Sequence, residues 1–313
     1  MNAPVSRRNF LWTLSGVATG LTLARSTPGH GFAAPKASST SGIRIGYASI
    51  TWGGKAQQAI NDISALGYHG IQLRSDDIKQ FPPAALRDEL RRKSLEFVAL
   101  SSGNVQIDPA AKASDIAAHM AHAQYMRDAG GHYLQVLDQE PGRSDFSASD
   151  YKYFGSVLSE LGKRTADIGI PLVYHNHLNS VSEHPEGLER VFDAVDPKYV
   201  KLLFDIAHYQ AGGGDPVKGI AQYKDHIALL HIKDLAKPFD LPVGNPRRLE
   251  DFVELGRGNV NIPGVFDALR RIKFHGWAMV ELDSENDKSR TPKESAEISK
   301  KYLQEKLGIN IQD

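Results

Sequence analysis

The sequence predicts an α/β protein folded as a single (β/α)8 TIM barrel. Short apolar runs rich in β-prone residues recur along the chain, and each is followed by a longer segment in which apolar residues return every three or four positions. Eight such units fill residues 43–313. That length is typical of one barrel, whereas an open doubly wound sheet would usually have fewer strands or a second domain.

The predicted strands are short and apolar, and in chain order they cover residues 43–48, 70–73, 96–100, 132–137, 171–175, 200–205, 227–232 and 277–282. The segments between them show helical spacing. After the first strand, one helical face is formed by Ala56, Ile60, Ile63 and Leu66. After the fifth, a similar face is formed by Leu188, Val191, Phe192 and Val195. No glycine-rich phosphate fingerprint follows the first strand, so a Rossmann fold is the weaker alternative.

The composition is that of an ordinary globular chain, with 41% of the 313 residues hydrophobic and 24% charged. The 37 Lys and Arg residues balance 37 Asp and Glu residues, so the basic surplus typical of nucleic-acid binding is missing. We therefore expect a small polar partner, no nucleic acid and no membrane after removal of a leader; a homo-oligomer is left open. With 12 His and no Cys, any transition-metal site must use imidazole and carboxylate ligands.

The N-terminus resembles a twin-arginine export signal. Arg7 and Arg8 precede a weakly apolar stretch at residues 12–24, and a small-residue segment follows at 31–34. We expect residues 1–34 to be the signal peptide, residues 35–42 a linker and residues 43–313 the barrel. This predicts a periplasmic or secreted protein, and a chain without Cys suits an oxidising compartment. The alternative is a cytoplasmic helix with two chance arginines.

Imidazole, carboxylate and ammonium groups stand at the ends of four successive predicted strands, where barrel enzymes place their chemistry. Each follows an apolar run that should be buried, and an unpaired charge there is costly. One divalent metal ion would satisfy these groups together, and a mixed nitrogen and oxygen shell suits Mn, Co, Zn, Fe or Mg. The candidates are His175 and His177 at the end of the fifth strand, Asp205 and His208 at the end of the sixth, His231 and Lys233 at the end of the seventh, and Glu281 at the end of the eighth.

Each of these residues also has a structural interpretation. A lone histidine at a strand end is commonly a hydrogen-bonded core residue, and some barrel enzymes use charged strand ends as acids and bases without a metal. Lys233 and Asp234 would form an exposed ion pair in that interpretation, with Asp234 structural. Four adjoining strand ends that carry such groups favour the metal site.

Three motifs give the chain a family likeness. They are Leu-Phe-Asp-Ile-Ala-His at 203–208, Leu-His-Ile-Lys-Asp at 230–234, and Glu-Leu-Gly-Arg-Gly-Asn-Val at 254–260 followed by Gly-Trp-Ala-Met-Val-Glu at 276–281. Through them, residues 43–307 resemble the xylose isomerase-like TIM barrel superfamily, which holds sugar phosphate isomerases/epimerases, hydroxypyruvate isomerase, inosose dehydratase and endonuclease IV. Residues 185–234 are most similar to the inosose dehydratase branch.

The resemblance implies that the sixth, seventh and eighth strands supply the metal ligands Asp205, His231 and Glu281. The family's strand-five ligand is usually glutamate, and His175 stands in its place. The fourth ligand is therefore left open between His175, which we favour, His177 and Glu183. In the epimerases the replaced carboxylate pairs with the strand-eight glutamate as one of two bases, so two-base epimerisation is disfavoured here. Strand two has Gln72 where many members carry glutamate, so a contact there would be neutral.

The resemblance also implies the chemistry. Members bind a polyol or keto-sugar through adjacent oxygens on the metal, and proton removal beside the carbonyl gives an enediolate. The candidate general bases are Glu281, His177 and His208, and the candidate acid for a departing hydroxyl is Lys233. The candidate substrate contacts are His208, Trp52 and Arg257. Their structural alternatives are a helix cap, a core position and a solvated loop position, respectively.

The sequence thus predicts a divalent-metal-dependent sugar isomerase/epimerase or a dehydratase (lyase) that acts on a keto-sugar or inositol-like polyol. One alternative is a periplasmic sugar-binding barrel that retains the site without turnover. A second is an endonuclease IV-like phosphodiesterase, which the neutral charge and the small ligand set disfavour.

Overall fold

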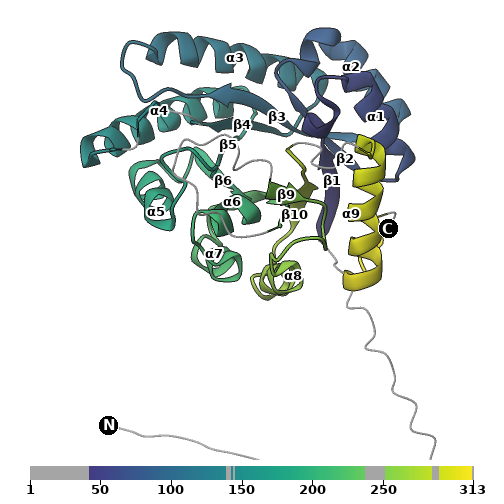
Figure 1. Cartoon of the computed structure of the whole chain (residues 1–313). Helices are drawn as coiled ribbons and strands as arrows, with labels where there is room; N and C mark the ends of the chain where they lie inside the picture. Colours follow the sequence, from purple (N-terminus) through teal and green to yellow (C-terminus); the bar gives the residue numbers. More distant parts are fainter. Residues whose placement is uncertain (1–41, 139–141, 144, 237–250, 284–288, 312–313) are drawn as a thin grey trace, which may run out of the picture. The chain divides into compact units, whose positions relative to one another are not determined.

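Eight parallel strands close into a barrel, and helices surround it (Figure 1). The computed structural model describes residues 42–138, 142–143, 145–236, 251–283 and 289–311. Around the barrel the strand order is β1-β10-β7-β6-β5-β4-β3-β2. The predicted (β/α)8 barrel is confirmed. The predicted signal peptide, residues 1–34, and the linker as far as residue 41 lie outside the described residues.

The barrel strands are β1 (Ile43–Ala48), β2 (Gly70–Arg74), β3 (Glu96–Asn104), β4 (Tyr133–Leu137), β5 (Leu172–His175), β6 (Val200–Asp205), β7 (Ile227–Ile232) and β10 (Gly276–Val280). The sequence places the first, sixth and seventh with the same bounds. Strand β10 ends one residue before Glu281, so this carboxylate lies just past the strand. A short antiparallel pair that we did not predict, β8 (Asp234–Leu235) and β9 (Phe252–Val253), follows β7.

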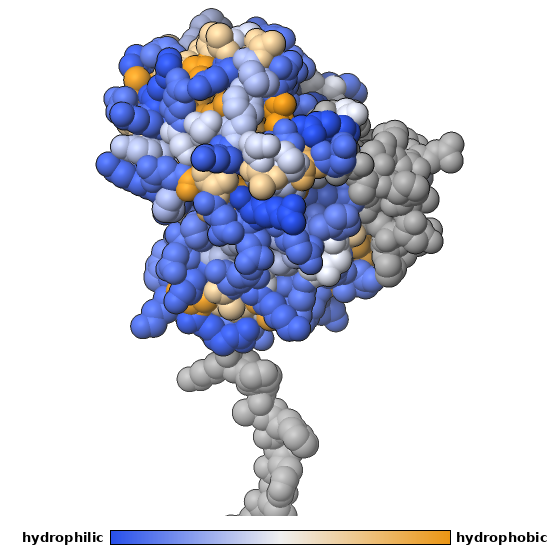
Figure 2. Space-filling view, turned by 90° about the vertical axis from the view of Figure 1, so that its left-hand side faces the viewer, coloured by the Kyte–Doolittle hydropathy of each residue, from blue (hydrophilic) through white to orange (hydrophobic). Residues whose placement is uncertain are grey.

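The helices are α1 (Ala56–Ala65), α2 (Pro83–Arg92), α3 (Lys112–Ala129), α4 (Ala148–Asp167), α5 (Pro185–Ala194), α6 (Ile206–Ala211), α7 (Pro216–Gln222), α8 (Ile262–Arg271) and α9 (Pro292–Leu307), with short 3-10 helices at Ser49–Trp52 and Asp77–Gln80. Capping boxes begin helices α4 and α9, at Ser147 with Asp150 and at Thr291 with Glu294. Within the described ranges, no helix combines the length and apolar character needed to cross a membrane. The face in Figure 2 is mainly hydrophilic, with small separated hydrophobic patches.

The barrel interior holds a small apolar cluster of its own, separate from the larger core in which the helices take part. Its buried members are Val98, Ala99, Val173, Leu203, Leu229, Trp277 and Met279. Since side chains two residues apart on a strand share a face, the next interior positions fall on polar residues. Val173 is followed by His175, Leu203 by Asp205, Leu229 by His231 and Met279 by Glu281. The fold therefore stacks a polar layer on an apolar one.

A buried asparagine fixes the ends of β5 and β6 relative to each other. Asn176 is 1% exposed, its Oδ1 accepts from the backbone N–H of Asp205 at 2.9 Å, and its Nδ2 donates to the backbone O of the same residue at 3.1 Å. These two bonds satisfy both backbone groups of Asp205 at the point where its side chain enters the barrel.

We predict that Asn176→Leu lowers the free energy of unfolding by about 3 kcal/mol, because it leaves two buried backbone groups without partners. Urea denaturation measures this loss. Gln57→Leu is the matched control, because the Gln57 amide donates an exposed hydrogen bond to Glu89, and we expect little change. An equal, small effect in both variants would contradict the proposed role of Asn176.

Candidate metal centre and active site

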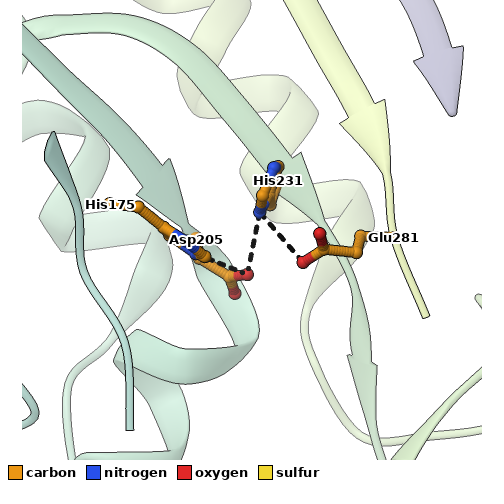
Figure 3. A group of neighbouring side chains, drawn as sticks. All are labelled: His175, Asp205, His231 and Glu281. Carbon is orange, nitrogen blue, oxygen red and sulfur yellow. Dashed lines mark hydrogen bonds and ion pairs between the residues drawn. The ribbon is translucent and has the colours of Figure 1, made fainter. Parts of the chain in front are cut away.

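Four of the sequence-predicted residues meet at one end of the barrel. His175, Asp205, His231 and Glu281 offer ligand atoms that all lie within 4.8 Å of one another (Figure 3). His175 ends β5 and Asp205 ends β6, while His231 is the second-last residue of β7 and Glu281 comes directly after β10. The four side chains are between 0% and 5% exposed. The structure thus brings together the ligand set that we favoured from the sequence.

Asp205 is oriented by the helix that follows it. Its Oδ1 caps the start of α6 by accepting from the backbone N–H groups of Ala207 and His208, each at 2.9 Å. This leaves Oδ2 directed at the histidines, 3.4 Å from His175 Nε2 and 3.5 Å from His231 Nδ1. The Oδ1 atom of Asp205 therefore caps α6, and the Oδ2 atom faces the two histidines.

His231 is oriented from the opposite side of its ring. Its Nε2 lies 2.9 Å from Gln72 Oε1 and donates to it, so Nδ1 faces the carboxylates. His231 Nδ1 lies 3.0 Å from Glu281 Oε2. The neutral contact that we expected at Gln72 is therefore made with the ring of a candidate ligand.

A second group adjoins the first and consists of His177, His208, Asp283 and Lys233. Ligand atoms of the two histidines and Asp283 lie within 4.8 Å of one another. The Lys233 Nζ stands between the groups, 2.7 Å from Glu281 Oε2, 2.8 Å from Asp283 Oδ2, 3.1 Å from His208 Nε2 and 3.3 Å from Asp205 Oδ2. Lys233 is fully buried, so the exposed ion pair with Asp234 that we considered is wrong.

The charges of the cluster stabilise one another. Burial by itself would raise the pKa of Glu281, but His231 and Lys233 hold that pKa well below its usual range. Burial would lower the pKa of Lys233, but Asp205, Asp283 and Glu281 raise it instead. Burial would also lower the pKa of His231, but the carboxylates of Glu281 and Asp205 raise that pKa to about 9. The Lys233 side chain therefore remains an ammonium at neutral pH.

His177 and His208 are neutral at the same pH. Burial lowers the pKa of His177 to about 4, with a smaller contribution from His175. Burial also lowers the pKa of His208 well below its usual value. His177 Nδ1 donates to the backbone O of Leu178 at 2.6 Å, so its Nε2 keeps a lone pair. This is the state that a general base requires.

The other candidates from the sequence lie apart from this layer. Trp52 is a core residue, 3% exposed, whose Nε1 donates to Asp62 Oδ2 at 3.0 Å. The Arg257 side chain is 47% exposed and lies 3.7 Å from Glu254 in the loop before α8. Glu183 is buried, and its Oε2 accepts from the backbone N–H of Asn179 at 2.7 Å rather than joining the four ligand groups. Trp52 and Arg257 thus match their structural alternatives.

Sequence analysis gave no functional role to two residues, although the alternation of side chains along a strand places them on the same face as the site. Asp283 follows Glu281 by two positions, and Gln135 lies on β4 with its amide 3.0 Å from His175 Nδ1. Asp234 is structural, as expected, but in a way that spacing does not reveal. It is buried and accepts from the backbone N–H groups of Leu235, Gly256, Gly258 and Val260.

The donor set fits a divalent cation. The buried carboxylates of Asp205 and Glu281 and the partly buried carboxylate of Asp283 each lie within 3.3 Å of the Lys233 Nζ. Among the described residues, His231 Nδ1 and Glu281 Oε2 have no hydrogen-bond partner of good geometry, although both are buried. Imidazole nitrogen and carboxylate oxygen that converge in this way are ordinary ligands of Zn, Mn, Fe and Co.

A family model described as the xylose isomerase-like TIM barrel matches residues 60–306 of this chain. The chain belongs to that family. Among curated proteins, the chain is 25% identical to the inosose dehydratase of Geobacillus kaustophilus over 83% of its own length and 94% of the relative. It is 26% identical to the rhizopine catabolism protein MocC of Rhizobium meliloti, over 78% and 82% of the two chains.

Solved structures share the fold at lower identity. The IolI protein with a zinc atom bound has a TM-score of 0.72 and 20% identity, over 85% of this chain and 98% of that one. The probable 3-DHS dehydratase AsbF from Bacillus anthracis has a TM-score of 0.69 and 17% identity, over 83% and 98% of the two chains. These likenesses show the common barrel.

We predict that Lys233→Met, measured in the presence of a chelator, lowers the free energy of unfolding at pH 7 by about 3 to 5 kcal/mol, because it leaves buried carboxylates without their cation. The pKa values of these carboxylates would then rise, so ionised carboxylates destabilise the variant more as pH increases. The loss relative to the native protein should shrink as the pH falls toward about 4. Chemical denaturation at the two pH values measures it.

Lys79→Met is the control, because that lysine makes an exposed ion pair with Asp76 and its loss should have no measurable effect at either pH. A pH-independent loss in Lys233→Met would contradict the electrostatic role of Lys233.

Proposed function

We propose that this protein is a metal-dependent lyase that removes water from a keto-sugar or keto-inositol, with isomerisation of a keto-sugar as the related alternative. The observation that carries the proposal is the juxtaposition of a cation-binding group with a lysine ammonium and a neutral histidine in one buried layer. The relatives named inosose dehydratase support the dehydratase reaction over the isomerase reaction.

Asp205, His231 and Glu281 would hold the ion, with His175 at the remaining side of the group. When bound, the ion would polarise a substrate carbonyl and so acidify the neighbouring C–H. The nitrogen and oxygen donors suit Zn, Mn, Co, Fe or Mg, and the solved relative that carries zinc shows that this fold can hold a metal.

The residues beside the ion supply the proton transfers of an elimination. His177 is neutral, and its Nε2 lone pair would accept the proton from the carbon next to the carbonyl. Lys233 remains an ammonium because the carboxylates raise its pKa, and it would donate a hydrogen bond, and finally a proton, to the hydroxyl that leaves as water. His208, fully buried beside Lys233, would contact a substrate hydroxyl.

The exchange of a carboxylate for His175 favours elimination over two-base epimerisation. An epimerase of this type needs a base on each face of the reacting carbon, and Glu281 has no facing carboxylate on β5. One base and one ammonium suffice for the loss of water, because the proton and the hydroxyl leave from adjacent carbons.

We predict that Asp205→Ala and His231→Ala lose the bound metal and keep the barrel. Elemental analysis of protein purified without chelator or metal-affinity resin should give near one divalent ion per native chain and almost none in either variant. Far-UV circular dichroism checks the fold. His184→Ala is the control, since the His184 side chain is 59% exposed, and it should retain the ion. Metal retained at the native level in both variants would contradict the assignment of the metal site.

We predict that His177→Gln lowers kcat for dehydration of an inosose by about 100-fold to 10,000-fold, with metal content unchanged, because the variant lacks the base. Mass spectrometry follows the loss of one water from the substrate. His184→Gln should act like the native enzyme. Native turnover in His177→Gln would exclude His177 as the base. Sugar binding without turnover in the metal-loaded native protein would favour the binding-protein alternative.

A further inference from the structure

A chain of four buried side chains crosses the barrel and joins two of the candidate ligands. His231 Nε2 lies 2.9 Å from Gln72 Oε1, Gln72 Nε2 lies 2.8 Å from Gln135 Oε1, and Gln135 Nε2 lies 3.0 Å from His175 Nδ1. All four residues are at most 3% exposed. The chain joins residues of β7, β2, β4 and β5 through side-chain hydrogen bonds.

Each glutamine in this chain passes on the direction of the hydrogen bond. A side-chain amide that accepts at its oxygen donates from its nitrogen at the other end. Because His231 donates to Gln72, Gln72 donates to Gln135 and Gln135 donates to His175. Reversing both amides exchanges the roles of the histidines and leaves one donor and one acceptor.

The two histidines therefore present different atoms to the metal-binding group. A neutral imidazole carries one hydrogen. His231 donates from Nε2, so once a metal replaces its second hydrogen the lone pair lies at Nδ1, the atom that faces both Glu281 and Asp205. His175, which accepts at Nδ1, carries its hydrogen on Nε2, the atom 3.4 Å from Asp205 Oδ2. A nitrogen that carries a hydrogen cannot ligate a cation.

We propose that Gln72 and Gln135 make the two histidines unequal, so that a metal at this site takes one histidine ligand, His231, while His175 donates to Asp205 and orients it. This inference rests on the metal site of the proposed function. Gln72, Gln135 and His175 are positioning residues. Both rings could ligate only if both donated into the chain, which would set the two amide nitrogens against each other and break the Gln72 to Gln135 bond.

Glutamate at either glutamine position removes this conflict. A carboxylate accepts from both sides, so Gln135→Glu would accept from Gln72 and from His175 Nδ1. The His175 hydrogen would then sit on Nδ1 and free Nε2 for the metal. Gln72→Glu produces the same result, because it accepts from His231 and from Gln135, whose oxygen can then turn to His175.

The test uses cadmium as a diamagnetic probe, in full-length protein whose histidines are isotopically labelled at the ring nitrogens. Scalar coupling between ring nitrogens and a magnetically active cadmium isotope counts the histidine ligands directly. We expect one coupled histidine in the native protein. The coupling should persist in His175→Gln and vanish in His231→Gln. The nitrogen shifts of His175 should report a hydrogen on Nε2.

In Gln135→Glu we expect a second coupled histidine, absent again in the double variant with His175→Gln. Added charge by itself would tighten cadmium binding without changing the number of coupled rings. If Gln135→Glu does not fold, Gln72→Glu provides the same comparison.

Two coupled histidines in the native protein, or coupling to His175 instead of His231, would overturn the inference and leave the metal site standing. If cadmium binds none of the four groups, and isothermal titration detects no binding of zinc either, the metal site itself is overturned. A single coupled ring in both native protein and glutamate variants would show that the glutamines do not control the ligand count, and would also overturn the inference.

Discussion

Side-chain alternation in a closed barrel is the constraint on which this site depends. Strands β5, β6, β7 and β10 each place an apolar residue in the interior and a polar one two positions later. Because the strands are parallel and neighbours in the barrel, the four polar groups arrive at the same end. The site is therefore a consequence of four strand sequences in register, with helix α6 adding His208 and the segments after β5 and β10 adding His177 and Asp283.

Charge balance then determines what this layer can do. Among the described residues, the carboxylates of Asp205, Glu281 and Asp283 share one permanent cation, Lys233. Further stability comes from protonating His231, whose pKa the carboxylates of Glu281 and Asp205 raise to about 9. A divalent ion would replace that proton and supply the remaining positive charge. The same field keeps Lys233 charged, while burial keeps His177 neutral. An acid and a base thus coexist within one buried site.

Much of this could be predicted from the sequence, because it follows from strand periodicity. Asp205, His231 and Glu281 are found together because each follows an apolar β run, and the family likeness indicates the same three residues. Other features depend on contacts between distant segments. Spacing along the chain contains neither the barrel register nor the path of the loops. It therefore could not predict the burial of Lys233, the hydrogen bond from Gln72 to Gln135, or the bonds that Asp234 accepts from the backbone of residues 256–260. Trp52 ends the 3-10 helix that follows β1 and packs in the core, which its place in the sequence does not reveal.

The most direct test of the central claim is anomalous diffraction from crystals of the protein loaded with cobalt or manganese. The account predicts one strong anomalous peak, within bonding distance of Asp205, His231 and Glu281 and beyond bonding distance of His175 Nε2. A peak among His177, His208 and Asp283 instead, or no peak in the barrel after soaking with excess metal, would contradict it.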